Sequence, residues 1–558
     1  MNFIQFWQQV WLLIKPFWLS NKRYVALLWL VIILSCAIFE VYMSVRLTEW
    51  NGGFYNSLQN YDQRKFFTLL VSGSIIMLLF VFATIFTYYS SSILEIQWRK
   101  WLTEYYLQAW VKSRSYYFSE FIQNNQDNPD QRISDDVHQF VNLTIKILIT
   151  SFRSIISLGS FLVILWRFSG NFIFNISTHS FFIPGYMVWL ALLYAGIGTY
   201  ITFKIGNPLI KLNYQQQCYE ANFRYNLVRI REHSQQIAAY KAAAIESQHA
   251  TRDFNHIVDN FMQVLRRNFK INMFNYTYGQ ISTIIPTLIS AGRYFARKIT
   301  LGDMMQINSA FARVQFAIAF LIYMYADIAT WRAVMNRLSD FMHLMDESAK
   351  IVVPPIYHHE LSLLVVKNLS IYNPAGNILV NNLSFEVSRA EHLLFVGKTG
   401  VGKSSLFKAL NGLWPYASGV ISERNGSKSL FIAQRPYLPL LNLKEAICYP
   451  LVNNLPSDTA IKELMIDCEL DALIEKLYTS GDWNKMLSIG EQQKIIFCRV
   501  LINKPDIVYL DESSSALDRA TELKLYNLLH AQLPQLAILT ISHNNQLRQL
   551  HKKIITIA

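Results

Sequence analysis

Long apolar runs recur through the first 335 residues of the chain, and a different pattern follows them. A helix needs about 20 mostly apolar residues to cross a bilayer. The runs that meet this length are residues 24–47, 66–89, 143–166, 182–203, 273–295 and 304–329. The last two carry several polar residues, which in a membrane usually face a bundle interior or a watery cavity. The pattern therefore predicts an α-helical membrane domain with six transmembrane helices.

The segments that separate these runs alternate in length and in charge. Residues 90–142 and 204–272 are long and rich in Lys and Arg, and cytoplasmic segments of membrane proteins carry an excess of these residues. We therefore expect both termini and both long segments on the cytoplasmic side. Aromatic and apolar residues at helical spacing in 95–118 and 223–246 indicate that the helices continue below the membrane.

A few charged residues lie in or beside the predicted spans, and each has two interpretations. Glu40 either contacts a substrate or carries a proton, or it lies near enough to the interface to stay wet. The same two interpretations apply to Asp327, for which we favour the interface. Arg293, Arg297 and Lys298 fall in the turn after residue 292, where they either reach the headgroups or face a substrate path. For these three we favour the headgroups.

The pattern changes after residue 345. Residues 346–360 form a linker rich in Pro and His. Residues 361–558 alternate short β-rich runs with helical ones, which predicts an α/β domain with a mainly parallel sheet. The predicted domains are thus 1–345, a membrane domain, and 361–558, a soluble domain.

Composition narrows the class of protein. Only 16% of the residues are charged, against about 25% in soluble domains. The net charge of +13 suggests either nucleic-acid binding or a basic cytoplasmic side. We favour the second and expect no nucleic-acid partner, because the basic residues flank apolar runs. The five cysteines show no CxxC pair, which argues against a zinc site or a disulfide framework.

The strongest chemical signal is a glycine-rich loop at residues 397–404. Its sequence, GKTGVGKS, fits G-x-x-x-x-G-K-[ST] in full, between a strand-like run (HLLFV) and a helical one (SSLFKALNGL). In such a loop, backbone N–H groups wrap phosphates, Lys403 reaches the β- and γ-phosphates, and Ser404 binds Mg²⁺. The residues predicted to bind the nucleotide here are Gly397, Lys398, Thr399, Gly400, Val401, Gly402, Lys403, Ser404 and Ser405.

An acidic strand end follows about a hundred residues later. The stretch IVYLDE at 507–512 places two carboxylates after four apolar residues. Asp511 is predicted to hold Mg²⁺, directly or through water, and Glu512 to orient and deprotonate the attacking water. Alone, such a pair is often an ordinary strand end exposed to solvent, but the preceding phosphate loop favours the catalytic interpretation.

These residues and others resemble the ATP-binding cassette of ABC transporters. LSIGEQQ at 487–493 resembles the signature motif, in which Ser488, Ile489 and Gly490 contact the nucleotide of a second subunit. The resemblance further implies that SALD at 515–518 is the D-loop, to which Ser515, Ala516 and Asp518 belong, and that Gln434 senses Mg²⁺. It also implies that His543 contacts the γ-phosphate. Tyr372 is our candidate to stack on adenine.

The membrane half resembles the SbmA/BacA-like group, which is related to the peroxisomal D subfamily. The matching stretches include WNGGFYNSLQ at 50–59, DNPDQRISDDV at 127–137 and ITLGDMMQINSAF at 299–311. The resemblance implies an exporter-type fold, a homodimer that closes on two ATP molecules with Mg²⁺, and a place in the bacterial inner membrane.

The resemblance also suggests what such a protein carries. The cargo it implies is a peptide or a hydrophilic solute such as a cobalamin-like molecule, with an acyl-CoA-like lipidic cargo as an alternative. An alternative of another class is a membrane-anchored regulatory or sensor ATPase that moves no solute.

Overall fold

The computed structural model describes residues 3–122, 128–176, 179–354, 356–359, 362–542 and 545–557. The chain divides into two compact units, Met1–Ala349 and Lys350–Ala558, and each is described by itself. His543, the predicted γ-phosphate contact, lies outside the described residues.

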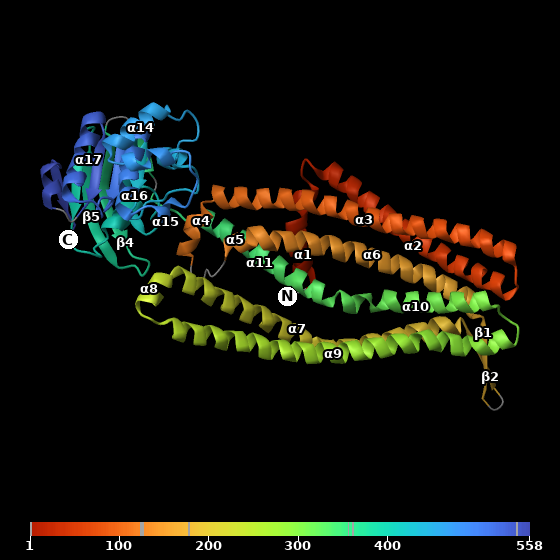
Figure 1. The fold of residues 1–558 in the computed structure, drawn as a ribbon. Coiled ribbons are helices and arrows are strands. Elements are labelled where there is room, and N and C mark those ends of the chain that lie inside the picture. Colours follow the sequence, from red (N-terminus) through yellow and green to blue (C-terminus); the bar gives the residue numbers. More distant parts are fainter. Residues whose placement is uncertain are drawn as a thin grey trace. The chain divides into compact units, whose positions relative to one another are not determined.

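The first unit is built almost entirely from long helices (Figure 1). Two short antiparallel strands, β1 (Asn171–Ile176) and β2 (His179–Pro184), connect α6 to α7. The helical elements are α1 (Phe3–Trp18), α2 (Arg23–Gln59), α3 (Gln63–Lys112), α4 (Ser115–Phe118), η1 (Ser119–Phe121), α5 (Pro129–Gln131), η2 (Arg132–Asp136), α6 (Val137–Ser169), α7 (Tyr186–Glu232), α8 (Ser234–Ala239), α9 (Ala243–Phe295), α10 (Leu301–Tyr323) and α11 (Tyr325–Ala349).

The predicted continuation of the helices beyond the apolar runs is confirmed. Helix α3 extends to Lys112, and α7 extends to Glu232 before α8 makes a short turn into α9. Helices α7 and α9 lie side by side along most of their length (Figure 1). The apolar parts of these helices are therefore joined to long polar parts without a break in the backbone.

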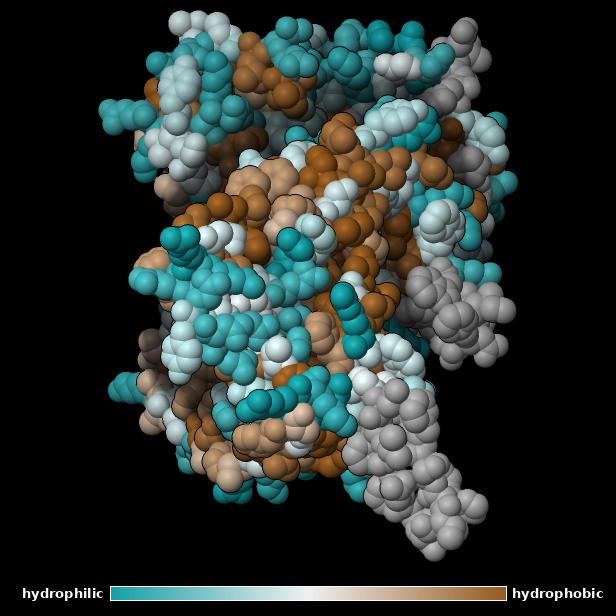
Figure 2. Space-filling view, turned by 90° about the vertical axis from the view of Figure 1, so that its right-hand side faces the viewer, coloured by the Kyte–Doolittle hydropathy of each residue, from teal (hydrophilic) through white to brown (hydrophobic). Residues whose placement is uncertain are grey.

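Five helical segments of the described chain are long and apolar enough to cross a membrane. They are α2, α3, Pro129–Ser169, α7 and Leu301–Ala349. The remaining predicted span, residues 273–295, is the second half of α9, which is not among these five. Large apolar side chains are exposed along the spans, among them Val31, Phe82 and Val163, and broad apolar areas are visible in Figure 2. Such exposure fits a lipid environment.

The charged residues of the spans have partners on other helices. Glu40 Oε2 lies 2.9 Å from Arg153 Nη2 on α6, and Asp327 Oδ2 lies 2.8 Å from Lys146 Nζ on the same helix. Arg293 Nη1 donates to the carbonyl of Phe168 at 3.0 Å, at the end of α6. A cation at a helix C-terminus satisfies carbonyls that have no partner within the helix.

The helices of the first unit pack around a core of aromatic residues near α1. Phe17 of α1 stacks on Trp98 of α3 with ring centroids 5.2 Å apart, and both side chains are buried. Beside this core, buried Asp136 accepts hydrogen bonds from Arg132 and from Arg337 of α11. Two guanidinium groups therefore compensate a carboxylate that would be costly to bury alone.

The second unit contains two sheets within its described residues. A five-stranded parallel sheet has the order β11-β6-β10-β9-β8, and a four-stranded mixed sheet has the order β3-β7-β4-β5. The strands are β3 (Ile356–His359), β4 (Leu364–Tyr372), β5 (Ile378–Val387), β6 (His392–Val396), β7 (Ala417–Arg424), β8 (Ser429–Ile432), β9 (Ile507–Asp511), β10 (Ala537–Ile541) and β11 (Lys553–Thr556).

Helices cover the parallel sheet and form a separate helical part. The fully buried strands β9 and β10 read as continuous apolar runs, as central parallel strands do. The helical elements are α12 (Lys403–Leu410), α13 (Leu443–Cys448), α14 (Asp458–Asp467), η3 (Asp471–Lys476), α15 (Trp483–Met486), α16 (Ile489–Asn503), α17 (Arg519–Gln532) and η4 (Asn545–Gln549). The predicted α/β domain with a mainly parallel sheet is confirmed.

Candidate nucleotide-binding site

The glycine-rich loop connects β6 to α12. Strand β6 covers the predicted HLLFV, and α12 begins at Lys403. Gly400 and Gly402 have φ angles of +84° and +102°, which L side chains rarely adopt. A Cβ at Gly402 would also lie 2.8 Å from Cβ of Leu379. The loop conformation therefore requires glycine at these positions, and it brings backbone N–H groups to the start of a helix.

Lys403 is directed back into this loop. Its side chain is largely buried, and Nζ donates to the carbonyls of Gly397 at 2.7 Å and Lys398 at 3.0 Å. Both acceptors belong to the predicted phosphate-binding loop. The ammonium group is therefore held inside the curve of the loop, where a phosphate would need it.

Ser404 and Asp511 meet at the carboxyl edge of the parallel sheet. Ser404 Oγ donates to Asp511 Oδ1 at 3.1 Å. Burial raises the pKa of Asp511, whereas the hydrogen bond from Ser404 and the charges of Lys408 and Lys403 act in the opposite direction. One hydroxyl and one carboxylate oxygen from two elements thus form a set of hard oxygen donors, the kind that Mg²⁺ prefers.

Glu512 follows in a strained conformation. Its φ is +49°, uncommon for a residue other than glycine, and its N–H donates to the carbonyl of Ile541 at 3.0 Å. Gln434 Nε2 donates to Glu512 Oε2 at 2.9 Å. The structure therefore brings together Gly397–Ser404, Asp511, Glu512 and Gln434. Backbone strain of this kind is frequent at active sites.

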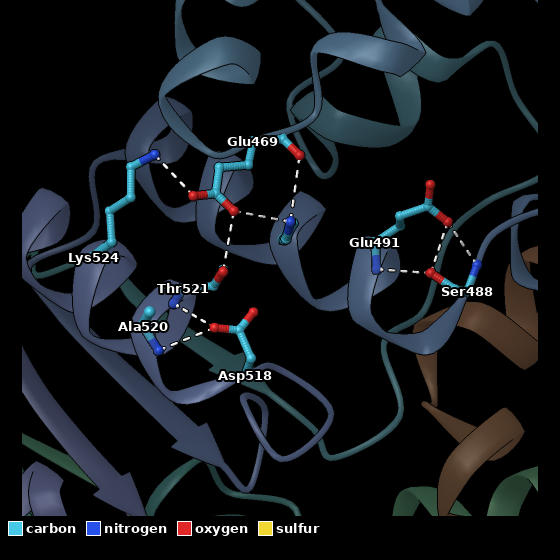
Figure 3. Close-up of polar contacts among 8 residues, drawn as sticks. Glu469, Ser488, Glu491, Asp518, Ala520, Thr521 and Lys524 are labelled. Carbon is cyan, nitrogen blue, oxygen red and sulfur yellow. Dashed lines mark hydrogen bonds and ion pairs between the residues drawn. The ribbon is translucent and has the colours of Figure 1, made fainter.

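The signature motif forms the start of α16, at a different part of the domain. Ser488 is the N-cap, and its hydroxyl accepts from the N–H of Glu491 at 3.3 Å while the Glu491 carboxylate accepts from the N–H of Ser488 at 2.8 Å (Figure 3). This capping box uses the N–H groups of Ser488 and Glu491, whereas those of Ile489 and Gly490 have no acceptor within the helix. Ile489, in that turn, is 62% exposed.

The D-loop residue Asp518 is the N-cap of α17. Its carboxylate accepts from the N–H groups of Ala520 and Thr521, both at 3.0 Å (Figure 3). These hydrogen bonds hold the pKa of Asp518 below its usual value. Tyr372 lies at the end of β4, and its hydroxyl is 3.3 Å from Ser418 Oγ. Among the described residues, no hydrogen bond joins Tyr372 to the glycine-rich loop.

Buried Gln493, the last residue of the signature motif, links α16 to the D-loop, a role that the motif alone does not indicate. Its Oε1 accepts from the N–H of Ala516 at 2.9 Å, and Nε2 lies 3.4 Å from Ser515 Oγ. Gln493 is on the signature helix and Ser515 and Ala516 are in the D-loop. A polar residue among the apolar positions of a buried helix is the signal that could have identified it.

A second link joins α16 to α17 through Glu469, which follows α14. Its carboxylate accepts from Lys524 Nζ at 2.9 Å, from Lys494 Nζ at 3.1 Å and from Thr521 Oγ1 at 3.1 Å (Figure 3). Lys494 belongs to α16, and Thr521 and Lys524 belong to α17. These hydrogen bonds, that of Lys524 first, lower the pKa of Glu469 to about 2.

Arg499 connects the signature helix to the segment that follows Gln434. The guanidinium is buried and donates to the carbonyls of Tyr437 at 3.0 Å and Ala446 at 2.7 Å. Burial lowers its pKa to about 10. No local pattern singles out this arginine, because its partners lie about fifty and sixty residues earlier in the chain.

A glycine-rich phosphate loop on a parallel sheet, with an acidic strand end and a capped signature helix, defines an ATP-binding cassette fused to a helical membrane domain. The family model described as "ABC transporter transmembrane region 2" matches residues 13–295, and the model described as "ABC transporter" matches residues 380–515. The chain belongs to the ABC transporters, which couple ATP hydrolysis to transport.

Full-length relatives confirm the expected resemblance to ABC transporters and to their D subfamily. An "Uncharacterized ABC transporter ATP-binding protein" of Haemophilus influenzae is 33% identical over 98% of this chain and 92% of its own. The "Inner membrane ABC transporter ATP-binding protein YddA" of Escherichia coli is 31% identical over 95% and 94%. The human "Lysosomal cobalamin transporter ABCD4" is 23% identical over 100% and 95%.

A solved structure supports the expected exporter-type fold. The "Structure of a bacterial Atm1-family ABC exporter with ATP bound" matches this chain with a TM-score of 0.74. The match covers 96% of this chain and 94% of the exporter chain. Its sequence identity is 16%, so the similarity concerns the fold.

Proposed function

We propose that this chain works as a homodimeric, ATP-driven transporter of a peptide or a hydrophilic solute, such as a cobalamin-like molecule, across the bacterial inner membrane. The ATPase activity in this proposal is supported by two hydrogen bonds beside the glycine-rich loop, Ser404–Asp511 and Gln434–Glu512. The name of the human relative suggests the cobalamin-like cargo. The name of YddA suggests the inner membrane.

The residues of the loop fit ATP and Mg²⁺. Gly400 and Gly402 leave the backbone N–H groups accessible, and Lys403 supplies a positive charge inside the loop. Ser404 and Asp511 supply oxygen ligands for Mg²⁺, and Gln434 lies close enough to Glu512 to respond to a cation there. The bound cation neutralises charge that develops on the phosphates. Glu512 orients and deprotonates the attacking water, and His543 contacts the γ-phosphate.

A second copy of the chain completes each site. Ser488, Ile489 and Gly490 lie at the exposed start of α16, whose N-terminal N–H groups favour an anion. The Ser488 hydroxyl at present donates to the Glu491 carboxylate at 2.7 Å. We propose that this helix start faces the nucleotide of the partner subunit, with Asp518 in the neighbouring D-loop. One chain then supplies half of each site, which a two-fold homodimer satisfies.

The positions of basic residues support cytoplasmic termini and a cytoplasmic cassette. The long polar parts of α3, α7 and α9 carry many of the Lys and Arg residues of the membrane unit. With these parts inside the cell, ATP reaches the cassette directly. The helical extensions then transmit closure of the cassettes to the membrane spans.

Glu512→Gln tests the catalytic assignment. The variant keeps the shape and the hydrogen bond to Gln434 but loses the base, so ATP binding persists while turnover falls by about a hundredfold or more. Full-length protein in nanodiscs is assayed for phosphate release and for retention of labelled ATP. Normal turnover in this variant removes Glu512 from the role assigned to it.

Reconstitution tests transport itself. Vesicles containing the wild-type chain are expected to move a labelled peptide or corrinoid only when ATP is hydrolysed, with the Glu512→Gln variant as the matched control. ATP hydrolysis without movement of any probe favours a membrane-anchored sensor ATPase. Movement of acyl-CoA alone favours a lipidic cargo.

A further inference from the structure

A polar stripe follows α6 through the membrane unit. The stripe consists of every seventh residue of the helix: Gln139, Lys146, Arg153, Ser160 and Arg167. Seven residues make nearly two helical turns, so these positions share one side of α6, each about 10.5 Å from the next. Arg153 is the middle residue of α6, and Ile149 and Phe161 nearby are buried. Cations along a span face the bundle interior or a watery cavity.

Carboxylates from two other helices meet this stripe. Lys146 pairs with Asp327 at 2.8 Å, and Arg153 pairs with Glu40 at 2.9 Å. The side chains of the cations are 52% and 37% exposed, and those of the carboxylates only 28% and 7%. The positive partner is therefore the more accessible one in both pairs, and the stripe presents cations to its surroundings.

Arg313 of α10 places a further positive charge in the same region. Arg313 interacts electrostatically with Glu40, and its guanidinium carbon lies 6.0 Å from the centre of the Phe161 ring on α6. Helices α2, α6 and α10 contact one another. Glu40 therefore pairs with the guanidinium of Arg153, and Arg313 adds a second positive charge to the same region. Four cations, Lys146, Arg153, Arg167 and Arg313, and two carboxylates, Glu40 and Asp327, leave a surplus of positive charge.

We propose that the α6 stripe, together with Arg313, is a binding path for a negatively charged cargo, whose carboxylate or phosphate groups pair with these cations. This inference rests on the proposed transport function and adds the chemical class of the cargo. The depth of Arg153 argues against a headgroup of the bilayer surface as its partner, because it lies midway along α6. A cleft lined by charge of one sign concentrates ions of the opposite sign.

Thiol labelling measures the electrostatic potential at the stripe without knowledge of the cargo. The full-length chain, with the partly exposed Cys36 and Cys218 replaced by alanine, carries Ser160→Cys in zwitterionic nanodiscs. Its reaction rates are measured with an anionic sulfonatoethyl and a cationic trimethylammonioethyl methanethiosulfonate. We expect the anionic-to-cationic rate ratio to exceed that of a free thiol by about tenfold. A ratio at or below the free-thiol value, or reaction with neither reagent, overturns the proposal.

Matched variants connect the ratio to named charges. Arg153→Gln and Arg313→Gln each lower it severalfold, Arg153→Lys retains it, and Glu40→Gln raises it. Arg46→Gln removes an exposed arginine paired within α2 to Glu49 and leaves the ratio unchanged. An unchanged ratio in both Arg153→Gln and Arg313→Gln also overturns the proposal.

A second labelling site controls for exposure to lipid. Ile155 is 69% exposed and lies on the opposite side of α6 from Arg153 by helical spacing. The Ile155→Cys thiol is therefore expected to react slowly with both reagents, and equal behaviour of the two sites contradicts the stripe as a path. Vesicle uptake measured separately tests transport. High ratios without uptake contradict the proposed transport, and uptake without high ratios contradicts only the anionic path.

Discussion

Glu469→Gln separates the structural from the catalytic role of the link between α16 and α17. The substitution removes the charge that pairs with Lys524 and Lys494, whereas the amide oxygen can still accept from Thr521. The pKa of about 2, against an ordinary 4.5, corresponds to at most about 3.4 kcal/mol. The side chain is 34% exposed, and solvent screening reduces this to about 1 kcal/mol.

The sign of the pH dependence follows from the direction of the shift. The folded-state pKa of Glu469 is depressed, so its contribution is fully present above pH 4.5 and is lost as the pH falls toward 2. For a unit the size of Lys350–Ala558, about 1 kcal/mol corresponds to about 3 °C in the unfolding temperature. Calorimetry of the full chain in detergent at pH 7 follows the cassette transition.

The control is Asp458→Asn, which breaks the ion pair of Asp458 with Lys444 in the same helical part of the cassette. Both variants are expected to lower the unfolding temperature slightly. Only Glu469→Gln also lowers the kcat for ATP, by about fivefold for about 1 kcal/mol, because Glu469 joins the helices of the signature motif and the D-loop. Equal kcat values for the two variants, or additive effects of Glu469→Gln and Lys494→Met, refute the reasoning.

Three further substitutions test other parts of the cassette. Arg499→Met leaves the buried carbonyl of Ala446 and the part-buried carbonyl of Tyr437 without their donor and lowers the free energy of unfolding by about 3 kcal/mol, measured by calorimetry. Gly402→Ala places a side chain at a φ of +102° and weakens binding of a fluorescent ATP analogue more than tenfold, whereas wild-type affinity contradicts the loop geometry. Gln493→Ala leaves the N–H of Ala516 without its acceptor and costs about 1–2 kcal/mol, seen as a lower unfolding temperature with lower kcat.

The parts of the cassette that were predicted correctly are those whose structure depends on a short stretch of sequence. HLLFV becomes β6, Gly400 and Gly402 adopt positive φ angles, and IVYLD becomes β9. In each case a short pattern carries its own physical reason, such as a buried parallel strand or a loop that needs glycine. The helical continuations of α3 and α7 were predictable for the same reason, since their periodicity is continuous along the sequence.

The residues that sequence reasoning missed act through distant partners. Gln493 contacts the D-loop, Glu469 joins elements that follow it by 25 to 55 residues, and Arg499 reaches back to Tyr437 and Ala446. Nothing in a local pattern distinguishes such a residue from a solvated one. The predicted span at 273–295 forms a continuous helix, but this second half of α9 carries too many polar residues to stand among the described helices that are apolar enough to cross a membrane.

The charges in the membrane unit show how much one set of contacts can change an interpretation. Polar or basic residues every seven positions, taken alone, are typical of a helix with a solvated side. In α6 the same spacing lies between buried apolar residues, and its carboxylate partners come from α2 and α11, which are far away in the sequence. From the sequence, Glu40 could be either a substrate contact or a residue hydrated near the interface. The structure adds a partner, Arg153, which neither interpretation includes. With Arg153 at 2.9 Å, the carboxylate is the counter-ion of one guanidinium, and Arg313 of α10 brings a further positive charge to the same region, which this carboxylate cannot also neutralise.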